Sequence, residues 1–175
     1  GEKRYILRPD ALNLNDSVIS GPNAEIKAGN SLPLRVLPIG TVIHNIELTR
    51  GRGGQLARGA GTRATISAKE GKIIQVRLPS GEIRIVSEEC FATVGVLGNI
   101  EWKNKVFGKA GTKIHMGIRP TVRGVAQSVR SHPHGGGGGQ GIGRPAPRSY
   151  AGRVAVGKTR NKKKYSNKYI LERRK

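Results

Sequence analysis

The chain has 175 residues, of which 32 are Lys or Arg and 11 are Asp or Glu, so its formal net charge is +21. Such an excess destabilises a compact chain unless a polyanion neutralises it. A run of 18 or more apolar residues is absent, as are an amphipathic basic helix and a lipid anchor, so membranes are excluded as partners. The single cysteine, Cys90, excludes an intrachain disulfide and a cysteine-rich zinc site, and it is expected to be a small buried hydrophobe. Nucleic acid is the expected partner.

The opening residues 1–35 predict one short strand, Glu2–Leu7, followed by turns at Gly21 to Asn23 and Ala28 to Asn30. These residues do not resemble a complete domain. The chain starts at Gly1, and its only methionine is Met116. We therefore expect it to be part of a longer precursor or one piece of a divided protein.

Strand patterns then follow one another. Residues 41–49 alternate, with one face formed by Val42, His44, Ile46 and Leu48. Residues 63–68 and 90–98 are further strands, and residues 72–86 predict a hairpin around Pro79, Ser80 and Gly81. In this hairpin Ile83 and Ile85 are expected to meet Ile74, Val76 and Leu78. Short strands separated by glycine turns predict a mostly β fold with a small antiparallel barrel. Because the chain has only two Phe, one Trp and four Tyr, its core is expected to consist of Val, Ile and Leu.

The second part of the chain is different. Residues 1–98 contain 13 basic and nine acidic residues, whereas residues 99–175 contain 19 basic and two acidic ones. Residues 99–111 predict one short helix with Asn99 as its N-cap and Gly108 near its C-cap. Beyond Lys109 no periodicity is sustained, and the final 18 residues are expected to be disordered in isolation. This region is typical of a basic arm that requires an anionic host.

Three segments are candidates for phosphate contact. In the loop 51–61 glycines alternate with arginines, which supply bidentate forks, although a merely flexible hairpin loop is the alternative. Residues 108–124 contain cations and no acid, and the tail is a basic run. The candidate RNA-binding residues of these segments are Arg50, Arg52, Gly53, Gly54 and Arg58; Lys109, Lys113, Arg119 and Arg123; and Lys158, Arg160, Lys162, Lys163 and Lys164.

A fourth candidate is the loop containing His132 and His134 and the glycines Gly135, Gly136 and Gly137. Between Glu101 and Glu172 the chain has no Asp, Glu or Cys, so neither a metal site nor a carboxylate-oriented general base is expected. Neutral imidazoles held by Pro133, followed by a backbone without side chains, suit insertion into folded RNA. His115 is also expected to contact RNA, and His44 to be a core or edge residue.

These motifs stand together in the order of a known family. The segments at residues 33–47, 53–61, 108–111, 119–124, 132–137 and 158–162 resemble the universal large-subunit ribosomal protein L-two family, over essentially the whole chain. The His-Pro-His-Gly pattern resembles its bacterial and organellar branch. The resemblance implies a partial OB-fold at residues 1–35, an SH3-like barrel at 36–97 and a basic, glycine-rich extension that threads rRNA at 98–175.

The resemblance also implies a function. The family binds large-subunit rRNA, contacts other ribosomal proteins and the small subunit, and supports subunit association, tRNA binding and the peptidyl-transferase region. We expect no enzymatic activity and no cofactor beyond structural Mg ions of the rRNA. Two alternatives are participation of His132 in peptidyl transfer and a free nucleic-acid chaperone.

The chain departs from the family pattern at several positions. Gln127 to Ser131 replace the family's Asn-Pro-Val-Asp, so the acid beside the first histidine is absent, and Ser149 to Gly152 replace its Pro-Trp-Gly. Together with the incomplete opening segment, these departures favour an organellar ribosome. A mitochondrial matrix is expected first, then a plastid or a bacterium, and a separate polypeptide is expected to supply the missing amino-terminal half.

Overall fold

The computed structural model describes residues 1–138, 141, 146–157 and 159–174. It is mostly β, with antiparallel strands in a barrel-like arrangement, as predicted. The chain divides into two compact units, which we call the barrel unit (Gly1–Lys105 and Tyr165–Lys175) and the extension unit (Val106–Lys164). Every helix in the described part of the chain is too short or too polar to span a bilayer.

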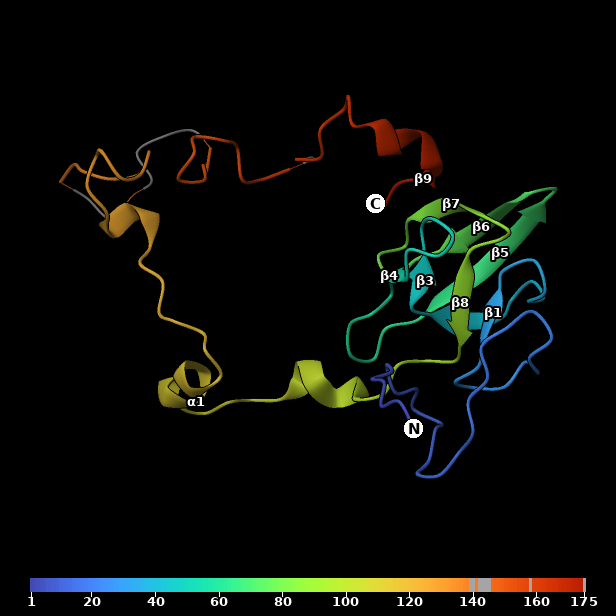
Figure 1. Ribbon diagram of the computed structural model, residues 1–175. Coiled ribbons are helices and arrows are strands. Elements are labelled where there is room, and N and C mark those ends of the chain that lie inside the picture. The colour runs from blue at the N-terminus through green and yellow to red at the C-terminus, as the bar shows by residue number, and fades with distance from the viewer. Residues whose placement is uncertain (139–140, 142–145, 158, 175) are drawn as a thin grey trace. The chain divides into compact units, whose positions relative to one another are not determined.

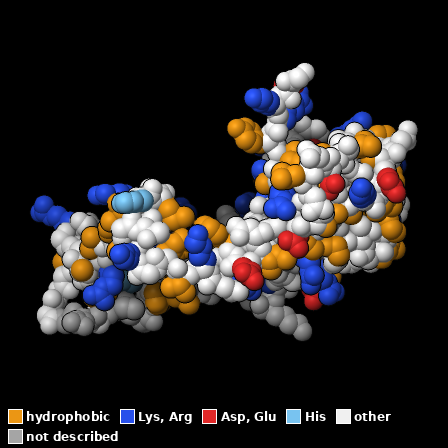
Figure 2. Space-filling view, turned by 90° about the horizontal axis from the view of Figure 1, so that it is seen from below, with side chains coloured by type: hydrophobic (Ala, Val, Ile, Leu, Met, Phe, Trp, Pro, Cys, Tyr) orange, Lys and Arg blue, Asp and Glu red, His pale blue; other side chains and the backbone are white. Residues whose placement is uncertain are grey.

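The two units differ in charge. All 11 acidic residues belong to the barrel unit, together with 19 of the 32 basic ones. The extension unit holds the remaining 13 basic residues and no acid. In Figure 2 the red carboxylate side chains accordingly lie over the barrel unit, and the extension unit shows blue without red.

The barrel unit contains all the named strands (Figure 1). A seven-stranded antiparallel sheet has the order β1-β8-β2-β5-β6-β7-β9, and β3 pairs with β4. The strands are β1 (Ser31–Pro33), β2 (Val42–His44), β3 (Ile46–Glu47), β4 (Gly54–Leu56), β5 (Ala64–Glu70), β6 (Ile73–Arg77), β7 (Ile83–Ser87), β8 (Phe91–Val94) and β9 (Ile170–Glu172). Pro33, which lacks a backbone N–H, lies in the edge strand β1, where a strand tolerates proline.

The predicted hairpin is confirmed. β6 and β7 pair from Ile73 with Ser87 to Arg77 with Ile83. Gly81 closes the turn at a φ of 84°, a left-handed value that favours glycine. The expected facing of the hairpin is wrong, however, because directly paired residues share a face. Ile74 pairs with Val86, so Val86 faces the core with it, and Ile85 pairs with Gln75 instead.

The single strand predicted at residues 41–49 is also wrong. Asn45 has a φ of 50°, which interrupts the alternation and separates β2 from β3. Ile43 and Ile46, three residues apart, are both fully buried, although strict alternation places them on opposite faces.

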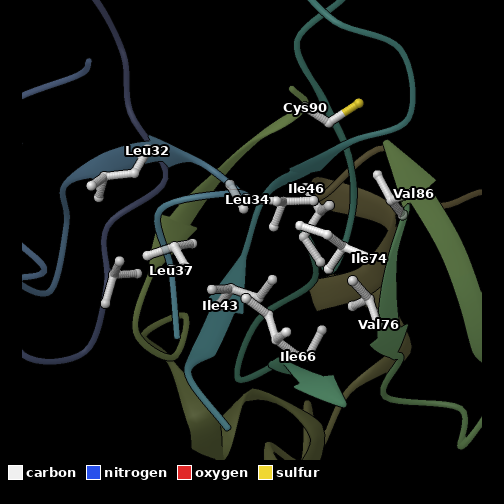
Figure 3. Close-up of a cluster of buried hydrophobic side chains, with 13 residues drawn as sticks. Leu32, Leu34, Leu37, Ile43, Ile46, Ile66, Ile74, Val76, Val86 and Cys90 are labelled. Carbon is white, nitrogen blue, oxygen red and sulfur yellow. The ribbon is translucent and has the colours of Figure 1, made fainter. Parts of the chain in front are cut away.

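The core consists of aliphatic side chains, as expected from the scarcity of aromatics. Figure 3 labels ten of its members: Leu32, Leu34, Leu37, Ile43, Ile46, Ile66, Ile74, Val76, Val86 and Cys90. Cys90 is a small buried hydrophobe, as predicted. Burial raises the pKa of its thiol, and the nearby Glu47 carboxylate acts in the same direction.

The opening segment forms no strand at Glu2–Leu7, contrary to the prediction. Tyr5 and Ile6 are exposed, and before β1 the segment meets the sheet through isolated bridges, Pro9 with Leu97 and Ser20 with Ser31, and through backbone hydrogen bonds such as that from the Gly29 N–H to the Val94 carbonyl at 3.1 Å. Asn30 fixes the end of this segment. Its buried side chain accepts the Ile19 N–H at 2.9 Å and donates to the Glu25 carbonyl at 3.0 Å.

The helix predicted at residues 99–111 is replaced by two shorter ones. A 3-10 helix, η1 (Ile100–Asn104), is followed by the α-helix α1 (Ala110–His115). Asn99 precedes η1 with a φ of 59° and gives no side-chain cap, because its left-handed backbone is not that of a conventional N-cap. Another 3-10 turn, η2 (Gly124–Ala126), lies further along the extension unit.

Within the full chain residues 165–172 have regular structure, whereas the expected disorder concerned the tail in isolation. They form a 3-10 helix, η3 (Tyr165–Tyr169), and then β9. β9 lies antiparallel to β7, with Ile170 beside Arg84 and Glu172 beside Ile83 (Figure 1). The basic extension therefore leaves the barrel unit after Lys105 and rejoins it at Tyr165, as a loop attached at both ends.

Candidate nucleic-acid interface

Residues 50–58, which we call the arginine loop, run from the connection after β3 through β4 to Arg58, and Glu47 holds the backbone of their first part. This side chain is 8% exposed. Its carboxylate accepts the backbone N–H groups of Phe91 at 3.0 Å, Gly53 at 3.1 Å and Gly51 at 3.4 Å. Hydrogen bonds to a buried carboxylate are strong. The N–H groups of Gly51 and Gly53 thus point inward, and phosphate contact from this loop falls to its side chains.

The three predicted arginines of the loop have different surroundings. Arg50 pairs with Glu89 at 3.1 Å, with both side chains more than half exposed. Arg58 donates to the Gly54 carbonyl at 3.1 Å. Within the described residues the Arg52 side chain has no hydrogen bond or ion pair, and it is exposed. Exposed ion pairs contribute less than about 1 kcal/mol, so Arg50 is readily redirected to a phosphate.

Gly54 is needed for close packing. A Cβ added there would collide with the side chain and carbonyl oxygen of Asn45, the residue whose left-handed backbone separates β2 from β3. Glycine is therefore required at position 54 because the backbone turn at Asn45 leaves no space for a side chain. The sequence pattern did not distinguish this packing role from close approach to an anion.

The basic segment of the extension unit presents its cations outward. Lys109 immediately precedes α1 and Lys113 lies on it, while Arg119 and Arg123 follow outside any helix or strand. All four are exposed, as is His115. Because no acidic residue occurs between Glu101 and Glu172, no intramolecular carboxylate competes within this segment for an external phosphate.

The histidine loop folds on itself through the two imidazoles. His132 Nδ1 accepts the His134 backbone N–H at 3.0 Å, and His134 Nε2 accepts the Arg148 backbone N–H at 2.9 Å. The ring centroids are 4.7 Å apart at an interplanar angle of 57°. A ring nitrogen that accepts carries no proton, so this arrangement requires both imidazoles to be neutral.

The glycines of this loop are partly used by the loop itself. A Cβ at Gly135 would collide with the carbonyl oxygens of Gln127 and Ser128, and one at Gly136 would collide with Val129. Gly136 N–H also donates to the Gln127 carbonyl at 3.3 Å. Only at Gly137, with a φ of 86° and open space around it, does the backbone become free of neighbouring side chains.

The basic tail before η3 is largely exposed. Lys162, Lys163 and Lys164 are exposed and Arg160 is half-buried, while Lys158 lies outside the described residues. These residues directly precede Tyr165, where the chain rejoins the barrel unit.

His44 is a core residue, as predicted. It is fully buried, and its Nδ1 lies 2.8 Å from the Gly95 carbonyl, to which the neutral ring donates. Burial lowers the pKa of His44, because the charged imidazolium is poorly solvated there. Across the described part of the chain, no three His, Cys, Asp or Glu side chains cluster in a way that would hold a metal ion.

Comparison with known protein families gives a match over most of the chain. Residues 27–152 match the family described as Ribosomal Proteins L2, C-terminal domain. The chain belongs to the ribosomal protein L2 family. The match confirms the resemblance drawn from the ordered motifs, and it spans the arginine loop, the basic segment and the histidine loop. The basic tail, η3 and β9 lie beyond it.

Membership of this family establishes the general role. Ribosomal proteins of this kind are generally structural components rather than enzymes, they lie in the ribosome, and their partners are rRNA and other ribosomal proteins. Sequence reasoning missed Glu47 as the organiser of the arginine loop. The available signal was an acid in an apolar strand immediately before a glycine-rich basic loop.

Proposed function

We propose that this chain binds large-subunit rRNA through the arginine loop, the basic segment, the histidine loop and the basic tail. The observation that carries the proposal is the extension unit, which has 13 basic residues and no acid within a ribosomal protein family. Each lysine or arginine that meets a phosphate releases condensed counterions, which favours binding entropically. A loop attached at both ends is well suited to follow an RNA surface.

The two units make different contacts in this proposal. The barrel unit presents a rigid arginine loop, whose backbone is held by Glu47, so its guanidinium forks meet phosphates with little loss of conformational entropy. The extension unit offers exposed cations on a chain that becomes ordered against the RNA, with the paired imidazoles as a fixed point for contact with bases.

The finer assignment follows the family. We place the histidine loop toward the functional core of the large subunit, with roles in subunit association, tRNA binding and the peptidyl-transferase region. The His-Pro-His-Gly pattern and the departures at Gln127 to Ser131 favour an organellar ribosome, a mitochondrial one first.

The proposal is tested by measuring how tightly the full chain binds purified large-subunit rRNA. Filter retention gives this affinity at a series of salt concentrations. Replacing Lys109, Lys113, Arg119 and Arg123 by Gln removes four cations from the basic segment. If all four meet phosphates, the slope of log affinity against log salt becomes shallower by about 3. The matched control replaces four exposed cations of the barrel unit, Lys3, Arg4, Lys27 and Arg35, with Gln. Equal losses in both variants would show that only net charge matters and would overturn the assignment of the segment.

The alternative of catalysis by His132 is tested in the assembled ribosome. The extension unit, to which this imidazole belongs, contains no Asp or Glu, and His132 Nδ1 accepts the His134 N–H. We expect His132→Ala to slow assembly or weaken association of the subunits while leaving the chemical step of peptidyl transfer intact. Normal assembly with a collapsed chemical step would instead support catalysis. Sedimentation of the chain apart from large subunits would support the free chaperone.

A further inference from the structure

A cavity of about 620 Å³ opens on the barrel unit where the tail rejoins it. Its walls come from β6, β7, the arginine loop and η3, and apolar lining is provided by Ile73, Ile85, Val86 and the buried Cys90. Its volume lies within the range of about 300–1,000 Å³ that is typical of small-molecule sites. The cavity therefore has room for a group of the size of one nucleotide.

Cations surround this cavity without any lining carboxylate. Four positive side chains contribute to the walls: Arg50, Arg52, Lys72 and Arg84. The Nε of Arg84 is buried and has no hydrogen-bond partner among the described residues. A buried donor without a partner is unfavourable, and an entering acceptor such as a phosphate or base oxygen removes that penalty.

Two tyrosines of the tail provide aromatic surface at the same cavity. Tyr165 is 80% exposed, and Tyr169 is 39% exposed with Lys168 Nζ 5.1 Å from its ring centroid. An exposed aromatic ring beside cations is the usual arrangement by which proteins hold unpaired bases, with stacking for the base and charge for the backbone.

We propose that this cavity receives one unstacked nucleotide of the RNA. Its base lies against Tyr165 and the apolar lining, its phosphate lies among Arg50, Arg52 and Lys72, and an acceptor meets Arg84 Nε. The inference rests on the proposed rRNA binding and adds a specific preference for an extruded base. It also assigns a role to η3, which lies beyond the matched family region and supplies Tyr165 and Tyr169 to the cavity.

Two RNA hairpins that differ in a single position test this site. One carries a bulged 2-aminopurine and the other has the same base paired in the stem. The full chain is expected to bind the bulged hairpin roughly tenfold more tightly, since stacking of one base contributes about that much. The fluorescence of the bulged base is expected to fall on binding, because it stacks on a tyrosine.

Tyr165→Ala is expected to abolish the preference for the bulged hairpin and the fluorescence change, while leaving affinity for the paired hairpin intact. The control is Tyr150→Ala, in which an equally exposed tyrosine of the extension unit is removed, at 81% exposure, and the preference is expected to persist. Equal affinity of the unaltered chain for both hairpins, or an unchanged preference in Tyr165→Ala, would overturn the inference. Failure to bind either hairpin would instead count against the proposed RNA binding itself.

A second variant tests the polar part of the site. Arg84→Met keeps the aliphatic stem and removes the guanidinium. If the variant keeps the unfolding midpoint of the parent chain, its affinity for the bulged hairpin is expected to fall severalfold and that for the paired hairpin to stay constant. Undiminished affinity for the bulged hairpin in such a folded variant would contradict the role of Arg84.

Discussion

The barrel unit and the extension unit are stabilised in opposite ways. Within the described residues every buried hydrophobic side chain belongs to the barrel unit, which also carries all 11 acidic residues. The extension unit has 13 cations, no acid and no buried hydrophobic side chain in its described part. The barrel unit thus has its own core, whereas the extension unit depends on neutralisation by a polyanion. The chain thus combines a unit that is stable through its own hydrophobic core with one that requires a polyanion for stability.

Truncation in the core should show the largest effect. Ile43→Ala, at a fully buried position, is expected to destabilise the barrel unit by about 2–5 kcal/mol, because it removes buried methyl groups and leaves a cavity. Val122→Ala, at an exposed position of the extension unit, is expected to leave the free energy of unfolding within about 0.5 kcal/mol of the parent value. Urea denaturation measures both. Equal effects would contradict the difference between the units.

Removal of the support beneath the arginine loop should be the next largest effect. Glu47→Ala leaves the N–H groups of Gly51, Gly53 and Phe91 without their acceptor, and a loss of about 2–4 kcal/mol is expected. Hydrogen exchange at these three amides is expected to accelerate. Glu47→Gln retains one carbonyl acceptor, so its stability and exchange rates should lie between those of the parent chain and those of Glu47→Ala. Unchanged exchange at Gly53 in Glu47→Ala would show that the carboxylate does not hold the loop.

The buried histidine should make the stability of the barrel unit depend on pH. Burial lowers the pKa of His44 below its ordinary value of 6.5, so the unfolded chain binds a proton more readily than the folded one. Stability is therefore complete above about pH 7 and declines as the pH falls below 6.5, by at most about 1.4 kcal/mol per pH unit. The difference between the parent chain and His44→Gln across this range isolates the effect. If the free energy of unfolding of both proteins depended on pH in the same way, His44 would not be the cause of the decline.

The surface ion pair of the arginine loop should have the smallest effect. Glu89→Gln removes the partner of Arg50 and is expected to change stability by less than about 1 kcal/mol, because both side chains are exposed. It should also raise affinity for RNA slightly, since Arg50 is released and one negative charge is removed. Weaker binding by this variant would show that Glu89 positions Arg50 for the RNA rather than competing for it.

The sequence allowed the hairpin of β6 and β7, the aliphatic core and the burial of Cys90 and His44 to be predicted, since these depend on local patterns and residue type. It did not reveal the break at Asn45, because the sign of φ at a single asparagine is set by the surrounding packing. The pairing of β9 with β7 joins residues more than 80 positions apart and follows no local signal. For the same reason no sequence pattern indicated that Tyr165 and Tyr169 line a cavity formed by strands far away in the chain.

Hydrogen exchange of the full chain, free and bound to large-subunit rRNA, tests the central difference most directly. Strands β5, β6 and β7 are expected to be protected in both states, because their hydrogen bonds enclose a core of their own. Amides of residues 109–136 are expected to exchange quickly in the free chain and to become protected only when RNA is bound. Strong protection of these residues in the free chain, or no gain in protection on binding, would contradict the view that the extension unit takes its order from RNA.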